Sequence, residues 1–239
     1  MFRKRILPLL MFVLLLFGLF IFPSIPIALF NIPYDKFDPI IQILYNFFCN
    51  VVFIIVLFLV YKDKLINDFK LYFKKFRDNF EMSFKYYFLG VVVMIVTNLI
   101  IALFFTGANA GNEEAVRGMI DKVPLYMIFS VSIYAPITEE LIFRHSIKDC
   151  VITSKKNKFS KYFYVFISGF IFAFMHILGQ TNSYIDYIYI IPYMSLGVAF
   201  ASLYYDSNNI FSSIMMHALH NTVTIILYLM SGGIVWLKK

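Results

Sequence analysis

Residues 124–147 read PLYMIFSVSIYAPITEELIFRHSI. A mostly apolar stretch of this length predicts a helix that crosses a membrane, because about 20 such residues span the hydrocarbon core of a bilayer. Glu139, Glu140 and Arg144 interrupt the stretch. An ionisable group inside hydrocarbon costs at least about 2.5 kcal/mol on insertion scales. These three residues are therefore candidates for a functional site inside the membrane.

The composition of the whole chain supports a membrane protein. Of its 239 residues, 61% are hydrophobic and only 15% are charged, and the mean hydropathy is +0.77. Soluble domains carry about 25% charged residues, so a soluble enzyme, a disordered chain and a nucleic-acid-binding module are excluded. We interpret the net charge of +7 as loop charge facing an anionic lipid leaflet, with no nucleic-acid partner.

Seven stretches are apolar enough to cross a bilayer or nearly so, and they predict an all-α, polytopic transmembrane helical bundle. The first is interpreted as an uncleaved membrane helix, since it is longer than the apolar region of a signal peptide. The tail at 232–237 would add a partial eighth helix. The stretches are 6–30, 40–61, 86–106, 124–147, 163–178, 187–205 and 210–230.

Basic residues predict the orientation of the bundle. The N-terminus and the connections 62–85 and 148–161 hold 15 of the 21 Lys and Arg residues. The positive-inside rule places these three segments in the cytosol. The connection 109–123 is acidic and is placed outside. Counting residues from the basic ends puts the candidate site in the inner half of the bilayer, open to the cytosol.

The chain divides into two predicted parts, residues 1–123 with N-terminal membrane helices and residues 124–231 with a catalytic membrane core. Within the first part, apolar residues recur every three or four positions along the basic connection 62–85. This spacing predicts an amphipathic helix in the headgroup region. It serves either as a docking segment on the bilayer or as a surface that recruits a partner. The recurring residues are Leu65, Phe69, Tyr72, Phe76 and Phe80.

Helix geometry gives the two adjacent glutamates different roles. Glu140 and Arg144 are four residues apart, so they lie on one face and can form an ion pair. Glu139 is rotated by about 100° from Glu140 and has no cation on its own helix. One carboxylate is therefore expected to be neutralised and the other to be available for chemistry. The alternative is that both carboxylates only connect helices.

Histidines on two further predicted membrane helices suggest a shared cavity. His176 lies in the fifth stretch, and His217 and Asn221 share one face of the seventh. A carboxylate and a histidine can hold a water molecule and take its proton. Histidine and asparagine can stabilise the oxyanion of a tetrahedral intermediate. His145 and His220 are expected to be structural or interfacial.

Two other chemistries stay open at this point. Glu139, His176 and His217 would also suit a zinc ion with an open fourth position, although the usual H-E-x-x-H helix is absent. Metal-bound water and water held by side chains cannot be separated by spacing alone. A nucleophilic serine is less attractive, because the sequence contains no G-x-S-x-G elbow.

Three motifs in this order resemble the CPBP family of intramembrane proteases, also called the CAAX protease or Abi family. They are Glu139-Glu140-x-x-x-Arg144, Phe172-x-x-x-His176 and His217-x-x-x-Asn221. The resemblance implies a membrane endopeptidase in which Glu139 activates water, supported by Glu140 and Arg144. It further implies that His176 assists with the water and that His217 and Asn221 stabilise the oxyanion, with Phe172 as a supporting motif residue.

The resemblance also implies a peptide or protein substrate. Relatives are linked to CAAX processing, bacteriocin maturation, self-immunity and peptide signals. The bias toward Phe, Ile, Lys and Asn suggests an AT-rich bacterial genome. The expected location is therefore a bacterial cytoplasmic membrane. The resemblance leaves zinc and metal-free catalysis equally open, and the oligomeric state is not predicted.

Two other functions compete with the protease. One is a non-catalytic membrane immunity or regulatory protein that binds a peptide or partner, and the other is a proton-coupled transporter. The sequence shows no repeated halves of the kind transporters use.

Overall fold

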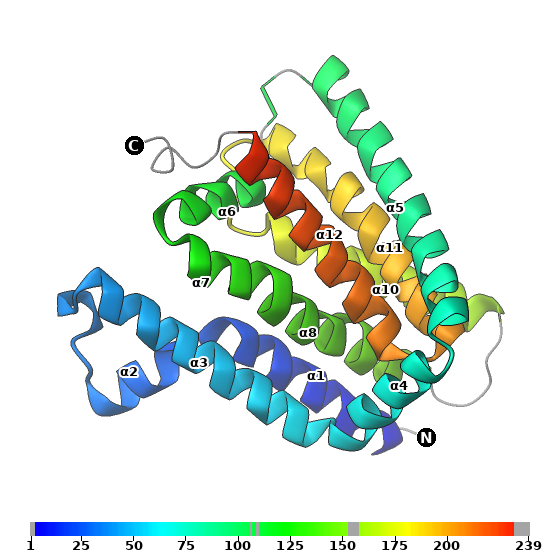
Figure 1. The fold of residues 1–239 in the computed structure, drawn as a ribbon, viewed down its shortest axis with the longest axis horizontal. Helices are drawn as coiled ribbons and strands as arrows, with labels where there is room; N and C mark the ends of the chain where they lie inside the picture. The colour runs from blue at the N-terminus through cyan, green and yellow to red at the C-terminus, as the bar shows by residue number, and fades with distance from the viewer. Residues whose placement is uncertain (1–2, 106, 109, 153–157, 232–239) are drawn as a thin grey trace.

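The computed structural model describes residues 3–105, 107–108, 110–152 and 158–231 of the chain. This part consists of helices joined by short turns, and no strand occurs within it (Figure 1). The predicted all-α bundle is therefore confirmed. Six of its helical segments are long and apolar enough to cross a membrane, so the chain is an integral membrane protein. They are α3 (Pro39–Val60), α5 (Phe76–Phe104), the segment Pro124–Val151, α10 (Lys158–Ile177), the segment Tyr184–Ser207 that contains α11 (Ile190–Ser207), and α12 (Ile210–Met230).

The first predicted span is broken. Helix α1 (Arg3–Ile21) and helix α2 (Ser24–Phe30) meet at an angle of 75°, and together they could count as a seventh span. Pro23 lies in the break, where its ring removes a backbone N–H that a continuous helix would use. A single helix through 6–30 was therefore wrong. The expected eighth segment at 232–237 lies outside the described residues.

The basic connection 62–85 forms a helical corner. Helix α4 (Lys62–Lys74) ends at Lys75, and α5 starts immediately afterwards. The side-chain amide of Asn79 donates hydrogen bonds to the carbonyls of Leu71 and Tyr72, at 3.1 and 2.9 Å. These contacts satisfy carbonyls that the end of a helix leaves free. The amphipathic helix therefore ends about ten residues earlier than predicted, and residues 76–85 begin a membrane helix.

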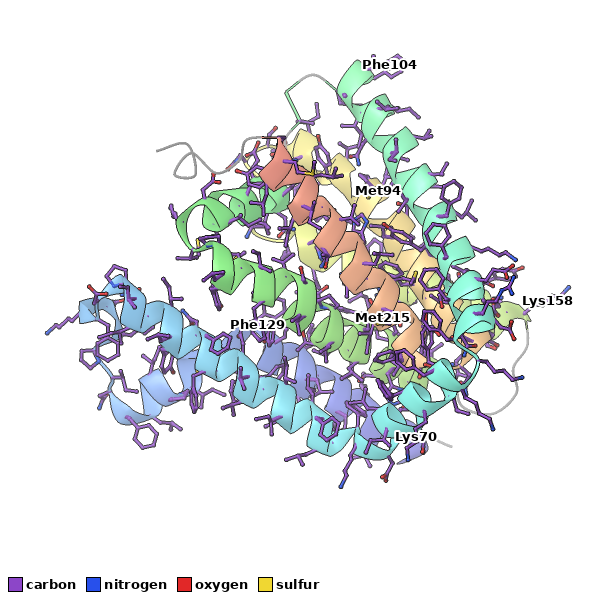
Figure 2. The ribbon with its side chains drawn as sticks, in the orientation of Figure 1. Lys70, Met94, Phe104, Phe129, Lys158 and Met215 are labelled. Carbon is purple, nitrogen blue, oxygen red and sulfur yellow. The ribbon has the colours of Figure 1, made fainter. Side chains whose placement is uncertain are left out.

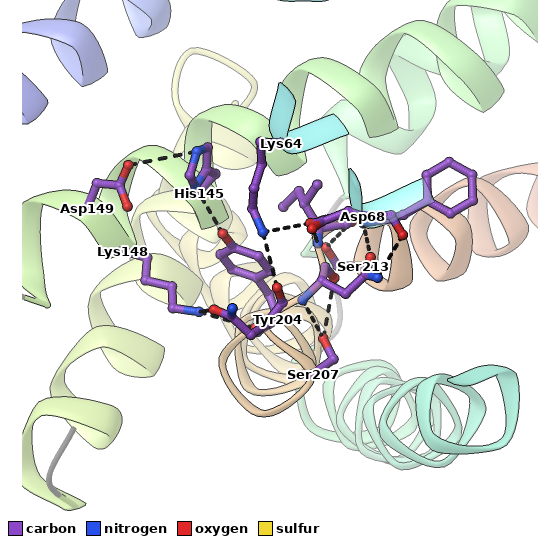
Figure 3. Close-up of polar contacts among 12 residues, drawn as sticks. Lys64, Asp68, His145, Lys148, Asp149, Tyr204, Ser207 and Ser213 are labelled. Atoms are coloured by element: carbon purple, nitrogen blue, oxygen red, sulfur yellow. Dashed lines mark hydrogen bonds and ion pairs between the residues drawn. The ribbon is translucent and has the colours of Figure 1, made fainter. Parts of the chain in front are cut away.

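The buried face of α4 fixes the start of α12 (Figure 3). Asp68 is buried, and its carboxylate accepts a hydrogen bond of 2.7 Å from the backbone N–H of Ile210. Asn209 donates to the Asp68 carbonyl at 2.8 Å, and Lys64 pairs with the Asp68 carboxylate at 2.7 Å. A carboxylate at a helix N-terminus satisfies free donors and favours the helix dipole. Helix α4 thereby positions the helix that carries His217.

The segment that holds the glutamates alternates between α- and π-helix. It runs through α7 (Pro124–Phe129), the π-helical η2 (Ser130–Tyr134), α8 (Ala135–Glu139), the π-helical η3 (Glu140–Ser146) and α9 (Ile147–Val151). A π-helix is rare and often occurs at functional sites. Hydroxyl groups of α10 bond to η3, from Ser168 to the Phe143 carbonyl at 2.7 Å and from Tyr164 to the Arg144 carbonyl at 3.2 Å.

Two glycines allow α10 and α11 to pack closely. A Cβ atom at Gly197 would lie 2.9 Å from the Cα of Gly169, and one at Gly169 would lie 2.8 Å from the Val198 side chain. Small residues at such a contact let two backbones approach each other, as in many membrane helix pairs. The close approach brings the aromatic rings of Phe172 and Phe200 to the same side as η3.

The basic and acidic segments lie at opposite ends of the bundle. Figure 2 places Lys70 and Lys158 at one end and Phe104 at the other. Residues 109–123, which were treated as a connection, contain helix α6 (Gly111–Lys122), and this helix lies at the end away from α4 (Figure 1). The division of the chain at residue 123 stays a prediction.

Candidate active site

Glu140 and Arg144 form the ion pair that their spacing predicts. The Nε of Arg144 lies 3.1 Å from Oε2 of Glu140, and both side chains are fully buried. The guanidinium also lies over the rings of Phe172 and Phe200, at 4.4 and 5.8 Å from their centroids. A desolvated cation over an aromatic face is stabilised by the ring quadrupole. Phe172, expected as a supporting residue, is therefore in contact with Arg144.

Glu139 faces two histidines from other helices. Its Oε2 lies 3.9 Å from Nε2 of His176 and 3.9 Å from Nε2 of His217. The same oxygen is buried and makes no hydrogen bond to any described residue. Buried polar atoms normally have a partner. The structure thus brings together three helices that the sequence only suggested would meet. The Glu139 oxygen that faces both histidines keeps its hydrogen-bonding capacity.

Hydrogen bonds at Nδ1 orient both imidazoles. His176 donates from Nδ1 to the Phe172 carbonyl at 2.8 Å. His217 donates from Nδ1 to Oε1 of Glu140 at 2.9 Å. A carbonyl oxygen can only accept, so the bond fixes the tautomer of His176 and leaves its Nε2 as the acceptor. The second glutamate therefore holds both Arg144 and His217, a contact that sequence spacing did not indicate.

Asn221 is fixed by the π-helix before Glu139. The N–H of Ala135 bonds to the Ser130 carbonyl, and the next residue, Pro136, has no N–H to offer the Val131 carbonyl. The amide of Asn221 donates to that carbonyl at 2.8 Å. The proline leaves one carbonyl free, and the asparagine occupies it with one of its two N–H groups.

A cavity of about 350 Å³ contains this cluster. Glu139, His176, His217 and Asn221 all line it. Most of its remaining lining comes from α5, α6, α11 and the second half of α12, toward the end of the bundle opposite the basic segments (Figure 1). The expected opening of the site toward the cytosol stays a prediction. Helix α6 and the start of α11 border the cavity, and hydropathy does not place such connections relative to a site.

Sequence reasoning missed three side chains at the cavity. The ring of Phe200 stacks on His217 at 5.2 Å between centroids, and the ring of Tyr193 lies 4.9 Å from that of His176. His220, expected to be structural, lines the cavity, and its Nδ1 lies 3.5 Å from the Tyr87 hydroxyl. Phe200 and Tyr193 carried no signal, because aromatic residues are common throughout this chain. His145 lies elsewhere, bonded to Tyr204 at 2.9 Å (Figure 3).

The candidate zinc ligands do not have the spacing of a zinc site as placed. Donors on one tetrahedral zinc ion lie about 3.4 Å apart, because each bond is about 2.1 Å long. The separations from Glu139 to the two histidines are 3.9 Å. Among the residues that the structure describes, no group of three His, Cys, Asp or Glu side chains has metal-site geometry.

Comparisons with known proteins agree with the cluster. Residues 121–223, which include every motif residue, match the family model described as type II CAAX prenyl endopeptidase Rce1-like. The chain is 30% identical over 186 residues to the protein named "Putative membrane peptidase YdiL" of Bacillus subtilis (strain 168), covering 76% of this chain and 68% of that protein. The chain belongs to the CAAX protease (CPBP) family. No solved structure gives a significant match.

Membership of the CAAX protease family identifies the general activity. The chain is an intramembrane protease, a hydrolase that acts on a peptide or protein substrate. The family match begins at residue 121, yet the cavity also includes residues of α5 and α6 from the preceding part of the chain. The CAAX protease core is thus completed by residues that lie outside the matched region.

Proposed function

We propose that this protein is an endopeptidase that hydrolyses a peptide bond inside the membrane with a water molecule activated by Glu139. One observation carries the proposal. The Oε2 atom of Glu139 has no partner among the described residues and lies 3.9 Å from Nε2 of both His176 and His217, inside a cavity. A general base must reach the proton that it abstracts, directly or through one water.

The polarity of two of these atoms suits a water molecule. The carboxylate of Glu139 accepts hydrogen bonds, and Nε2 of His176 is also an acceptor because its Nδ1 carries the proton. A water that donates one proton to each directs a lone pair away from both. That lone pair is available to attack the carbonyl carbon of a bound peptide bond.

The reaction then proceeds in two steps that balance. Glu139 takes a proton from the water, the oxygen bonds to the carbonyl carbon, and the carbonyl oxygen becomes an oxyanion. The C–N bond then breaks as Glu139 returns the proton to the leaving nitrogen, giving a carboxyl group and an amine. No acyl-enzyme forms on this route.

His217 and Asn221 are placed to stabilise the oxyanion. Glu140 accepts from Nδ1 of His217, so Nε2 of His217 donates to the oxyanion only when the ring carries a second proton. Asn221 uses one amide N–H on the Val131 carbonyl and keeps the other. Donors already oriented toward the developing charge are the main source of such stabilisation.

We propose that substrates are bacterial peptides, in bacteriocin or signal-peptide maturation, self-immunity or CAAX-like processing at the cytoplasmic membrane. The support is the family match to a prenyl endopeptidase model and the similarity to a Bacillus subtilis protein. The competing proposal is a non-catalytic membrane protein that binds a peptide without cleaving it.

The substitution Glu139→Gln tests the proposal. Gln keeps the size and hydrogen-bonding capacity of the side chain but removes the base. In liposomes, cleavage of an internally quenched farnesylated CAAX-type peptide should fall at least about 100-fold, since general base catalysis contributes about 10² to 10⁴. Glu81→Gln is the matched control, because Glu81 is an exposed carboxylate paired with Lys85, and it should leave the rate unchanged.

Retained cleavage in Glu139→Gln would contradict the proposed base. Retained biological activity of Glu139→Gln without any cleavage would favour a non-catalytic protein that binds a peptide.

The same cleavage assay in the presence of a chelator, with metal content measured by mass spectrometry, separates metal-bound water from water held by side chains. We expect unchanged cleavage by metal-free protein, and loss that zinc restores would instead assign zinc to Glu139, His176 and His217.

A further inference from the structure

The cavity extends beyond the catalytic cluster to a wall formed by α5 and α6. Apolar and polar side chains share this wall, and Met94, labelled in Figure 2, lies on the side of α5 that faces α12. Two uncharged amides, Asn98 on α5 and Asn112 on α6, line the cavity among them. Neither residue belongs to the family motifs, and both precede the region that matches the family model.

Asn98 lies on a membrane-spanning helix without a hydrogen-bond partner in the described part of the chain. It is only partly exposed, and apart from Thr97 the residues around it on α5 are apolar. A side-chain amide offers two donors and one acceptor, and leaving them unpaired at membrane depth is costly. Such a residue is therefore a candidate for contact with whatever occupies the cavity.

Asn112 connects the same wall to the catalytic cluster. Its Nδ2 lies 3.4 Å from the Tyr193 hydroxyl, which is long for a hydrogen bond. The Tyr193 ring lies against His176, with centroids 4.9 Å apart. The amide of Asn112 thus has hydrogen-bonding groups that remain available. Only the Tyr193 side chain separates it from His176, which is proposed to bind the water.

The charges near these amides are already compensated. Glu113 and Arg117, which also line the cavity, form an ion pair with each other. The wall therefore offers neutral donors and acceptors rather than a free charge. A neutral group that alternates donors and acceptors at close spacing is the main chain of a peptide.

We propose that Asn98 and Asn112 bind the main chain of an extended peptide substrate on one side of the scissile bond. This inference rests on the proposed function and adds the segment of substrate that the cavity recognises. A helical substrate keeps its N–H and C=O groups paired internally and gains nothing from two amides. An unwound segment has free main-chain groups and is stabilised by them.

The test compares Asn98→Leu and Asn112→Leu with wild type, using the same quenched farnesylated peptide in liposomes. The hydrogen bonds contribute to binding, so KM should rise about three- to tenfold in each variant while kcat stays within about twofold. Thr97→Val is the matched control. Thr97 is adjacent on α5, and its hydroxyl bonds to the carbonyls of Val93 and Met94 in its own helix. It should leave KM unchanged.

Main-chain recognition has a signature that a structural role would not produce. N-methylation of single peptide bonds in the substrate removes one N–H at a time. At one position it should raise KM about three- to tenfold for wild type but less than about twofold for Asn98→Leu, because the same bond is already lost. Equal effects at every position, or an unchanged KM in both Leu variants, would overturn the inference.

Binding separates this inference from the proposed function. In the Glu139→Gln background, the Kd of the farnesylated peptide, measured by fluorescence anisotropy, should weaken about three- to tenfold on adding Asn98→Leu. If Glu139→Gln still cleaves, the proposed base is wrong, whereas the Kd ratio still decides whether Asn98 binds substrate. A Kd ratio near one overturns the role of Asn98 even when the base is correct.

Discussion

Arg144 is the largest side chain that is fully enclosed in the described structure. A buried guanidinium is tolerated only where charges and rings surround it, and here Glu140, Phe172 and Phe200 do so. Glu140 in turn orients His217. Arg144 therefore acts on His217 through Glu140, which contacts both side chains.

Arg144→Ala should be strongly destabilising. Removing one partner leaves Glu140 as an uncompensated buried charge, which costs about 3 to 5 kcal/mol. We expect a large fall in the thermal unfolding midpoint in detergent and in the amount of folded protein. Glu140→Gln combined with Arg144→Ala should recover part of the loss, because the uncompensated carboxylate is gone. Equal stability of Arg144→Ala and wild type would show that the pair contributes nothing.

At the residue scale, the sequence located the charged and imidazole groups because such groups are costly in a membrane. It did not locate Phe200 or Tyr193, since aromatic residues make up 20% of the chain and their positions alone carry no information. The role given to His220 was also incomplete, because helix rotation was judged without knowing that α5 borders the cavity.

At the element scale, the close contact between α10 and α11 holds Phe172 and His176 near Phe200 and Tyr193 of α11. Gly197→Ala adds a Cβ atom 2.9 Å from the Gly169 backbone, so the helices must separate. Overpacking of this kind costs about 1 to 3 kcal/mol. We expect a lower unfolding midpoint and reduced cleavage per folded molecule.

Gly118→Ala is the control for that substitution, because nothing lies within 4 Å of a Cβ atom built there. It should be neutral or slightly stabilising, since Ala favours helix over Gly. A Gly197→Ala protein as stable and active as Gly118→Ala would show that the close contact is dispensable.

Helix boundaries were predicted well where apolar runs are long, and less well at Pro23 and Lys75, where local backbone geometry decides.

At the scale of the whole molecule, the basic segments and the cavity lie toward opposite ends of the bundle. The positive-inside rule predicts that the basic end faces the cytosol. On that orientation, we expect the cavity lining of α6 to lie toward the other side of the membrane.

Labelling of single cysteines checks this placement in intact cells. In a protein with Cys49 and Cys150 replaced by Ser, a membrane-impermeant maleimide should label Met119→Cys on α6 and leave Lys70→Cys on α4 unlabelled. Both native side chains are exposed in the structure. Cell lysis should make Lys70→Cys reactive, which controls for accessibility. The reverse pattern would place the N-terminus outside and the cavity toward the cytosol.

Hydropathy and local spacing were enough to predict a helical membrane protein and to select the ionisable groups that are candidates for its chemistry. Both conclusions follow from the cost of polar groups in hydrocarbon, which depends on composition and local spacing. Three features became visible only in the folded chain: Glu140 bonds His217, a proline frees the carbonyl held by Asn221, and Asn98 and Asn112 line the cavity. These contacts join residues distant in the sequence, and helix tilt, close glycine packing and connections determine them rather than hydropathy.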